Sequence, residues 1–343
     1  MSDTKERIVL DVAYQPQVRT AKDTRNIMLD VIIALLPALA VSVWQFGIHP
    51  LIVCLSSMVS AVVFEWGYRK IMKKDNTIGD LSACVTGILL ACTLPASAPW
   101  WLPVIGTFFA IVIVKQLYGG IGKNFLNPAL AGRAFLLASY ATIMGTWKTP
   151  VSVAAYVDGA TMATPLSSLY GGSLIFPQWF NLKTMFFGAV PGCIGEVSAL
   201  AILIGFLYLL VRKVIDWRIP VSFVGTVALV CLVFGRKNFS NVDWMLYNVL
   251  SGGLLFGAVF MATDYTTSPV TPNGQLIFGA GCGLITILIR YFGGYPEGVS
   301  YAILIMNLCA WAIDKAFNRP QFGVTKEDLA AEKAAKKAAK EAK

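Results

Sequence analysis

Long apolar segments separated by short polar stretches run through most of this chain. A helix needs about 20 apolar residues to cross a lipid bilayer, and most of the segments approach that length. The pattern predicts ten membrane-spanning helices, at residues 27–47, 50–70, 80–95, 101–118, 128–147, 184–211, 219–235, 244–263, 275–292 and 297–317. The predicted fold class is therefore an all-α integral membrane protein with about ten transmembrane helices.

The composition strengthens this prediction. Of the 343 residues, 56% are hydrophobic and only 14% are charged, whereas a soluble domain has about 25% charged residues. The net charge of +9 does not indicate binding to nucleic acid, because the basic residues flank apolar segments, as membrane orientation requires. The first 25 residues are polar and contain no apolar signal-peptide core.

The basic residues also predict how the chain is oriented. If the N-terminus is cytoplasmic, 23 of the 28 lysines and arginines fall in cytoplasmic segments and five fall outside. This bias follows the positive-inside rule and predicts that both termini lie inside. The chain then divides into a cytoplasmic N-terminal segment (1–26), a first transmembrane repeat (27–147), an extracytoplasmic loop (148–183), a second transmembrane repeat (184–317) and a charged cytoplasmic tail (318–343).

The two repeats are indicated by a short internal similarity. The motif TLPASAP at 93–99 closes the third apolar segment, and TDYTTSP at 263–269 closes the eighth. Each is followed by an aromatic residue and two glycines, at 118–120 and 292–294, and then by another apolar segment. Because five helices is an odd number, the second repeat is inverted relative to the first. Inverted repeats place binding sites near the middle of the membrane.

The segment GGIGKNFLNP at 119–128 is the first candidate site. Its glycines permit sharp turns and close approach of a ligand. Asn124 and Asn127 are three residues apart, so they share a face on a helical turn. Each amide offers two donors and an acceptor, which suits a heteroaromatic ring with carbonyls and ring nitrogens. The alternative is a loop at the membrane edge, followed by a helix that begins at Asn127 with Pro128 in its first turn.

Two acidic residues are candidates for ion coupling. Asp264 follows an apolar run, and Glu196 lies in the glycine-rich stretch GCIGEVS at 192–198. An acid at membrane depth is costly, which makes it a functional candidate. The alternative for Asp264 is a hydrated position at the cytoplasmic edge.

The predicted outside loop contains DGATMATPL at 158–166. Asp158-Gly159 marks a turn, and Pro165 favours an extended backbone at Thr164. Small neighbours leave the hydroxyl of Thr164 accessible to a bulky reagent. The alternative is an ordinary loop without a function.

The cysteines do not indicate a metal centre. There are seven, none in a CxxC pair, and nearly all lie inside apolar segments; His49 is the only histidine. We interpret the cysteines as small packing residues. The sequence therefore predicts no metal site, and it shows no catalytic residue.

Taken in order, four segments resemble the NqrB/RnfD family of flavin-bearing membrane subunits. They are GGIGKNFLNPALAGRAF (119–135), DGATMATPL (158–166), GCIGEVSAL (192–200) and MATDYTTSPVTP (261–272). The resemblance covers nearly the whole chain after residue 20. It is greatest to the D-type member of the Rnf ion-translocating electron transport complex, because NqrB proteins carry a longer N-terminal region.

The resemblance implies two flavins. Members of this family carry FMN joined by a phosphoester to a threonine in an S/T-G-A-T motif. The matching residues here are 161–164, which makes Thr164 the expected attachment site; Met162 replaces the glycine of the motif, so Thr161 is the alternative. A second, non-covalent flavin (riboflavin or FMN) is expected near Asn124, Asn127 and Asp264.

The resemblance also implies a place in an enzyme complex of a bacterial or archaeal cytoplasmic (inner) membrane. Such a complex couples electron transfer between ferredoxin and NAD⁺ to translocation of Na⁺ or H⁺, and its other members are the A, B, C, E and G proteins of the Rnf complex. No GxGxxG fingerprint or iron–sulfur spacing is present, so ferredoxin and NAD⁺ are expected to meet other subunits. The alternatives are an NqrB-like quinone-reductase subunit, a ten-helix secondary transporter without a redox role, and a purely structural scaffold.

Overall fold

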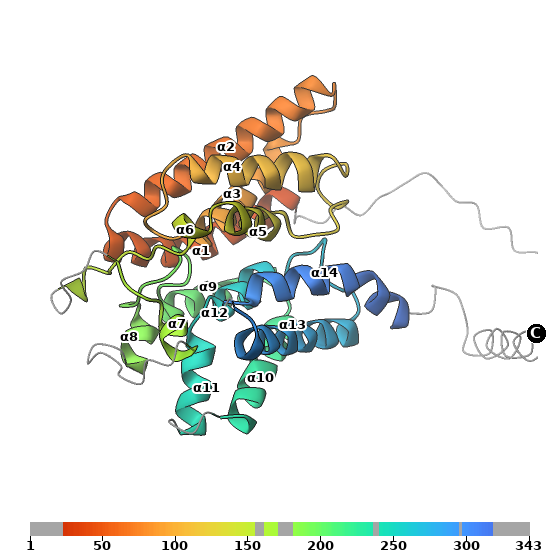
Figure 1. The fold of residues 1–343 in the computed structure, drawn as a ribbon. Coiled ribbons are helices and arrows are strands. Elements are labelled where there is room, and N and C mark those ends of the chain that lie inside the picture. The colour runs from red at the N-terminus through yellow and green to blue at the C-terminus, as the bar shows by residue number, and fades with distance from the viewer. Residues whose placement is uncertain (1–22, 155–160, 171–180, 236–239, 295–296, 318–343) are drawn as a thin grey trace, which may run out of the picture.

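The computed structural model describes residues 23–154, 161–170, 181–235, 240–294 and 297–317. The predicted Asp158-Gly159 turn lies outside these residues. Within them the regular structure is helical, and strand pairing is limited to two isolated β-bridges. Figure 1 shows two groups of helices that lie one against the other.

Both groups follow the order of the chain. The first consists of α1 (Thr24–Phe46), α2 (His49–Ile71), η1 (Ile78–Asp80), α3 (Ser82–Cys92), α4 (Leu102–Phe108), η2 (Phe109–Gln116), α5 (Pro128–Ser139) and α6 (Ala141–Met144). Two short helices follow, α7 (Pro165–Tyr170) and α8 (Leu182–Phe187). The second group consists of α9 (Ala199–Val211), α10 (Arg218–Val233), α11 (Asn241–Leu250), α12 (Leu254–Phe256), η4 (Gly257–Met261), α13 (Pro272–Phe292) and α14 (Val299–Ala316). Contacts of α1 with α9 and of α5 with α14 join the two groups.

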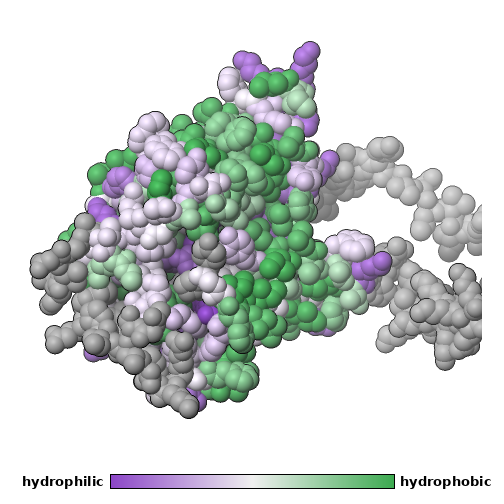
Figure 2. Space-filling model, viewed as in Figure 1, coloured by the Kyte–Doolittle hydropathy of each residue, from purple (hydrophilic) through white to green (hydrophobic). Residues whose placement is uncertain are grey.

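The outer surface of both groups is apolar. Large side chains such as Trp44, Leu207 and Leu229 are 74%, 63% and 63% exposed. Figure 2 shows a broad hydrophobic area over the helices, with hydrophilic residues on the left, at the top and at the right edge of the view. A soluble monomer rarely exposes so much contiguous apolar surface, whereas a lipid-facing surface requires it. The prediction of a helical membrane protein is confirmed at this level.

The number of spans is not settled by helix length. In the described part, α1, α2, α13 and α14 are long and apolar enough to cross a membrane, and α11 with α12–η4 forms a fifth candidate that is bent by 60°. Helix α3 has 11 residues, which corresponds to a length of about 16 Å at 1.5 Å per residue. The hydrocarbon core is about 30 Å thick. Ten spans, the inverted repeat and the orientation therefore remain predictions.

Three predicted segments are wrong as continuous helices. Segment 128–147 is divided between α5 and α6 at Tyr140, and segment 244–263 is divided between α11 and α12 by residues 251–253. Over 184–211 the structure has two helices, because α8 ends at Gly188, whose φ of 108° lies in the left-handed region, and α9 begins only at Ala199. The irregular backbone between them pairs with the irregular segment after α3. The amide of Ile194 donates to the carbonyl of Leu94 (2.9 Å). Non-helical backbone is tolerated at membrane depth when other protein segments satisfy its polar groups in this way.

Glycines allow the closest helix crossings. A Cβ atom on Gly205 of α9 would lie 2.4 Å from the carbonyl oxygen of Ala34 on α1. A Cβ atom on Gly279 of α13 would lie 2.7 Å from the carbonyl oxygen of Ile219 on α10. Small residues at such crossings let helix backbones approach, which is how helices associate in lipid.

Three basic residues that the orientation count includes as inside or outside charges are buried. Lys115, Arg133 and Arg290 are 3%, 7% and 2% exposed. Each is held by protein groups; Arg290, for example, donates to the carbonyls of Asn248 (2.7 Å) and Ser251 (3.0 Å). The sequence around such a charge therefore does not show whether the charge faces water or a buried protein group. These three residues carry no information about orientation.

Candidate functional site

A cavity of about 290 Å³ lies where the first turns of α1, α3 and α5 meet the ends of η2, α9 and η4. Its apolar wall includes Ile27, Met28, Val31, Val85, Leu89, Val259 and Phe260, and its polar wall includes Ser82, Lys115, Asn124, Asn127, Asp264 and Thr266. Ligand pockets usually have volumes of roughly 300–1,000 Å³, are mostly apolar and have a few polar groups. This cavity is therefore large enough for one planar ring system of modest size.

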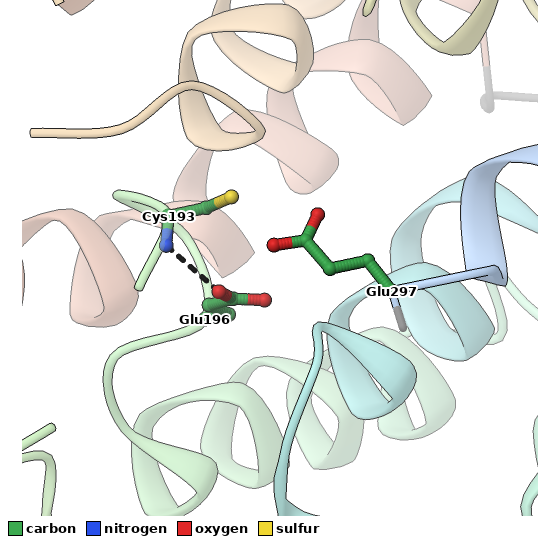
Figure 3. A group of neighbouring side chains, drawn as sticks. All are labelled: Cys193, Glu196 and Glu297. Carbon is green, nitrogen blue, oxygen red and sulfur yellow. Dashed lines mark hydrogen bonds between the residues drawn. The ribbon is translucent and has the colours of Figure 1, made fainter. Parts of the chain in front are cut away.

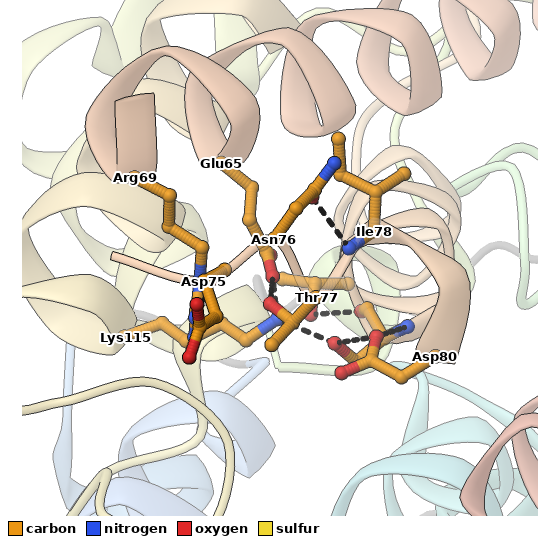
Figure 4. A network of polar contacts seen from close by, with 10 residues as sticks. Glu65, Arg69, Asp75, Asn76, Thr77, Ile78, Asp80 and Lys115 are labelled. Atoms are coloured by element: carbon orange, nitrogen blue, oxygen red, sulfur yellow. Dashed lines mark hydrogen bonds and ion pairs between the residues drawn. The ribbon is translucent and has the colours of Figure 1, made fainter. Parts of the chain in front are cut away.

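The cation in the cavity wall is Lys115, at the end of η2. Its Nζ atom lies 2.7 Å from Oε2 of Glu65 and donates to Oγ of Ser82 at 2.6 Å. The side chains of Lys115 and Glu65 are 3% and 1% exposed. The other carboxylate oxygen of Glu65 accepts from the hydroxyl of Thr77 at 2.8 Å. Figure 4 shows this network between the loop before α3 and the end of η2.

Asn124 and Asn127 both line the cavity but use their amides differently. Oδ1 of Asn127 accepts from the amides of Ala129 and Leu130 (3.0 and 3.3 Å), so it caps α5, and Nδ2 donates to the carbonyl of Met261. The alternative prediction of a helix beginning at Asn127 is confirmed. Asn124 donates through Nδ2 to the carbonyl of Leu126 and to Thr266 Oγ1. Within the described residues no hydrogen bond to its Oδ1 is present.

Asp264 lies in the same wall, directly after η4. It is half-buried, which contradicts a fully hydrated position at the membrane edge. Its Oδ2 atom accepts from the hydroxyls of Thr266 (3.0 Å) and Thr267 (3.1 Å). The structure thus brings Asn124, Asn127 and Asp264 to one cavity, although more than 130 residues separate Asp264 from the two asparagines in the sequence.

Glu196 belongs to a different group of polar side chains, which we call the Arg133 cluster (Arg133, Cys193, Glu196 and Glu297). Sγ of Cys193 and oxygens of the two glutamates all lie within 4.8 Å of one another, and Figure 3 shows the three side chains converging from two segments. Arg133 pairs with Glu297 and lies 3.4 Å from Sγ of Cys193. The other glutamate, Glu196, accepts from the amide of Cys193 at 2.8 Å.

Thr164 lies at the start of α7 and is 6% exposed. Its Oγ1 atom accepts from the amide of Ser167 (3.2 Å) and is within 3.1 Å of the hydroxyl of that residue. The cavity beside Thr164, which Glu196 and Glu297 also line, has a volume of only about 10 Å³. Among the described residues, this cavity is too small for an isoalloxazine ring. Thr161, the alternative residue, is exposed.

Several of these groups could not be identified from the sequence. Lys115, Arg133 and Glu297 were not predicted as site residues, because a charge at the end of an apolar segment looks the same whether it faces water or a buried partner. Apolar residues flank Arg133 on both sides in LAGRAFLL at 130–137, which indicates burial but does not show which group the charge faces. The fold and the cavity define the class: a helical membrane protein with an internal, partly charged binding cavity.

The comparisons identify the family. The model of the NQR2, RnfD, RnfE family matches residues 11–323, and the chain belongs to this family. One relative is the D component of the "Na(+)-translocating ferredoxin:NAD(+) oxidoreductase complex" of Acetobacterium woodii, which is 47% identical over 321 residues, covering 92% of this chain and 96% of the relative. The D component of the "Proton-translocating ferredoxin:NAD(+) oxidoreductase complex" of Clostridium ljungdahlii is 41% identical, with the same coverage.

A third relative has a less specific name. It is the D component of the "Ion-translocating oxidoreductase complex" of Salmonella enteritidis, which is 36% identical over 348 residues, covering 92% of this chain and 98% of the relative. The resemblance to the NqrB/RnfD family, and to its D-type members in particular, is confirmed. Since these relatives are subunits, the chain is consistent with an enzyme only as part of a complex.

Proposed function

We propose that this chain is the flavin-carrying membrane subunit of an Rnf-type complex, which relays electrons between ferredoxin and NAD⁺ and couples them to ion translocation. The observation that carries the proposal is the cavity between the two helix groups, with Lys115, Asn124 and Asp264 in an otherwise apolar wall. We assign a non-covalent flavin, riboflavin or FMN, to this cavity. A bound isoalloxazine supplies the electron transfer, and the protein supplies position and electrostatics.

Each wall of the cavity has a definite task in this proposal. The apolar residues of α1 and α3 exclude water from the flat faces of the ring. The free Oδ1 of Asn124 accepts a hydrogen bond from a ring N–H, which fixes the orientation. The ammonium of Lys115 favours the negative charge that arrives with an electron, because electrostatic attraction is strong in a site shielded from water.

The proposal predicts that Asn124→Leu lowers the non-covalent flavin content of the purified complex by at least about tenfold. The substitution fills the ring's place with an apolar side chain and removes its acceptor, and an unpaired buried polar group costs about 1–3 kcal/mol. Flavin extracted with acid and separated by chromatography gives the measurement. Asn241→Leu, on the exposed start of α11, is the matched control. Full non-covalent flavin content in Asn124→Leu contradicts the assignment of the flavin to this cavity. Absence of non-covalent flavin from the unaltered complex also contradicts it, and favours a transporter or a scaffold.

We further propose a covalent FMN on Thr164. Its support is the T-M-A-T match at 161–164 and the family membership, while the closed arrangement of α7 means that the transferase acts before this segment docks. Helix α7 is held against α11 by a specific contact, in which the hydroxyl of Tyr170 donates to Oδ1 of Asn248 at 2.8 Å. No electron-transfer step is derived through this group.

Ion coupling is assigned to Asp264 and Glu196, which line separate cavities. We expect Asp264→Asn and Glu196→Gln each to abolish ion transport by the complex in proteoliposomes while flavin content is kept, because a neutral side chain no longer attracts a cation. Asp243→Asn, at an exposed position of α11, is the control. Unchanged transport in both variants contradicts the assignment. The ion itself, Na⁺ or H⁺, differs between the names of the Acetobacterium woodii and Clostridium ljungdahlii relatives.

The finer architecture is part of the same proposal: ten spans as two inverted five-helix repeats, with both termini in the cytoplasm and the chain in the inner membrane beside the A, B, C, E and G proteins of the complex. Pairings within the groups support the repeat. Helix α2 packs against α4 as α10 packs against α13, and α4 packs against α5 as α13 packs against α14. Helix α1 begins the first predicted repeat, and α9 is the main helix at the start of the second, after the short α8. Helices α1 and α9 pack against each other across the two groups.

A further inference from the structure

Lys115 is not only a charge in the cavity wall; it is the inner end of a chain of hydrogen bonds. Its Nζ donates to Oγ of Ser82 at 2.6 Å, and Oγ of Ser82 donates to Oδ1 of Asp80 at 2.6 Å. Lys115 and Ser82 are 3% and 5% exposed. Asp80, at the end of η1, is half-buried and borders the exposed loop 71–76. The chain of hydrogen bonds therefore connects the cavity with the surface of the protein in two steps.

We propose that Asp80, Ser82 and Lys115 form a proton path between the surface and the ligand in this cavity. The inference rests on the proposed function, since it needs a ligand that gains and loses protons as it is reduced and oxidised. The inference names the residues that supply the proton and the surface from which the proton enters, which the proposed function does not specify.

The path balances in protons. An N–H bond of Lys115 breaks as its proton passes to a basic nitrogen of the reduced ligand, where a new N–H bond forms. The neutral amine of Lys115 then takes the hydroxyl proton of Ser82, and Ser82 takes a proton from the carboxyl group of Asp80. Water at the surface reprotonates Asp80, so the net change is one proton taken from water for one delivered. Oxidation of the ligand moves a proton the opposite way, from Lys115 through Ser82 to Asp80. The hydrogen bonds in the structure already point in this direction, since Lys115 donates to Ser82 and Ser82 donates to Asp80.

Glu65 on α2 neutralises Lys115, and Ser82 satisfies a second of the three N–H donors of the buried ammonium. The bond from Ser82 to Asp80 extends this arrangement toward the surface. The other titratable groups around Lys115 are Asp80 on η1, Asp264 after η4 and the thiol of Cys84 on α3. Of these, Asp80 has a continuous hydrogen-bonded connection to Nζ within the described residues. Glu65 stays as the fixed counter-charge, since Thr77 and Lys115 occupy its two oxygens.

The test uses the whole purified complex and measures proton uptake, with a pH-indicator dye in a stopped-flow instrument, when the flavins are reduced chemically. Variant Asn124→Leu, which lacks the cavity flavin, identifies the uptake phase that belongs to it. We expect Ser82→Ala and Asp80→Asn each to slow this phase by at least about tenfold, a threshold below the roughly 100- to 10,000-fold that positioned acid–base groups contribute. Flavin content is measured in each variant beside the rate, because Ser82 lines the cavity. Ser82→Thr, which retains a hydroxyl, should restore the rate.

Ser57→Ala is the matched control, because Ser57 is also a buried serine but donates to the carbonyl of Gly87 (2.6 Å), outside the path. Uptake at the unaltered rate in Ser82→Ala and Asp80→Asn, with flavin bound, overturns the path and leaves the proposed function standing. Loss of flavin from both variants assigns the two residues a structural role and also overturns it. Absence of a cavity flavin from the unaltered complex overturns both proposals.

Discussion

Thr164→Val should remove covalently bound flavin from this subunit completely. A phosphoester needs a hydroxyl oxygen, and valine has nearly the shape of threonine without that oxygen. The structural cost is small by comparison, because the substitution removes one capping bond of α7, worth about 1 kcal/mol. The measurement is ultraviolet fluorescence of the denatured protein band on a gel, from cells that possess the flavin transferase. The mass of the peptide 149–183 then shows whether FMN is attached.

Two neighbouring hydroxyls serve as controls for this experiment. Thr161→Val tests the alternative attachment residue, and Ser167→Ala removes the hydroxyl that lies 3.1 Å from Oγ1 of Thr164. Both variants should keep the fluorescent band. A band that persists in Thr164→Val and is lost in Thr161→Val would move the attachment site to Thr161. A colourless, unmodified subunit in the unaltered strain would remove the covalent cofactor from the proposal.

Lys115→Met should destabilise the subunit by about 3–5 kcal/mol, the typical cost of removing one partner of a buried ion pair. The carboxylate of Glu65 is 1% exposed and would keep its charge with only the hydroxyl of Thr77 for compensation. Thermal unfolding in detergent, followed by tryptophan fluorescence, gives the measurement. The cavity flavin should also be lost or weakened, because its only buried cation within the described residues of the wall is gone.

The double variant Lys115→Met with Glu65→Gln separates these two effects. Glutamine keeps an acceptor for Thr77 and carries no charge, so most of the lost stability should return. Proton uptake at the cavity should not return, because the inner end of the path is still missing. A single variant Lys115→Met with the stability of the unaltered protein would show that the pair is hydrated and contributes little, as exposed ion pairs do.

The membrane class could be read from the sequence because it depends on composition. Apolar segments of near-spanning length with few charges are stable only in a lipid bilayer. The exposed apolar surface around Trp44 and Leu229 agrees with this environment. The lengths of α1, α2, α13 and α14 were also predicted closely. The break between Phe187 and Ala199 was not, although Pro191 and the glycines of GAVPGCIGEVS at 188–198 are local signals for it. What the sequence did not show is that a distant segment at Leu94 satisfies part of the polar backbone there.

The candidate site divides in the same way. Asn124, Asn127 and Asp264 were predicted together through motifs, and the structure places all three at one cavity. The sequence offered a helix beginning at Asn127 as an alternative, but it did not show that the amide of Asn127 also donates to Met261, nor that Thr164 is buried at the start of α7. Those features depend on hydrogen bonds between residues three to 134 positions apart.

By itself, then, the sequence determined that the chain lies in lipid and which motifs it shares with a family of redox subunits, because hydropathy and motif spacing are local properties. Only the tertiary structure decided which charges are buried and what they face. Lys115 and Glu65 are 50 residues apart, and Arg133 and Glu297 are 164 apart. The environment of a charge is set by whichever segments the fold packs around it, and no local pattern contains that information.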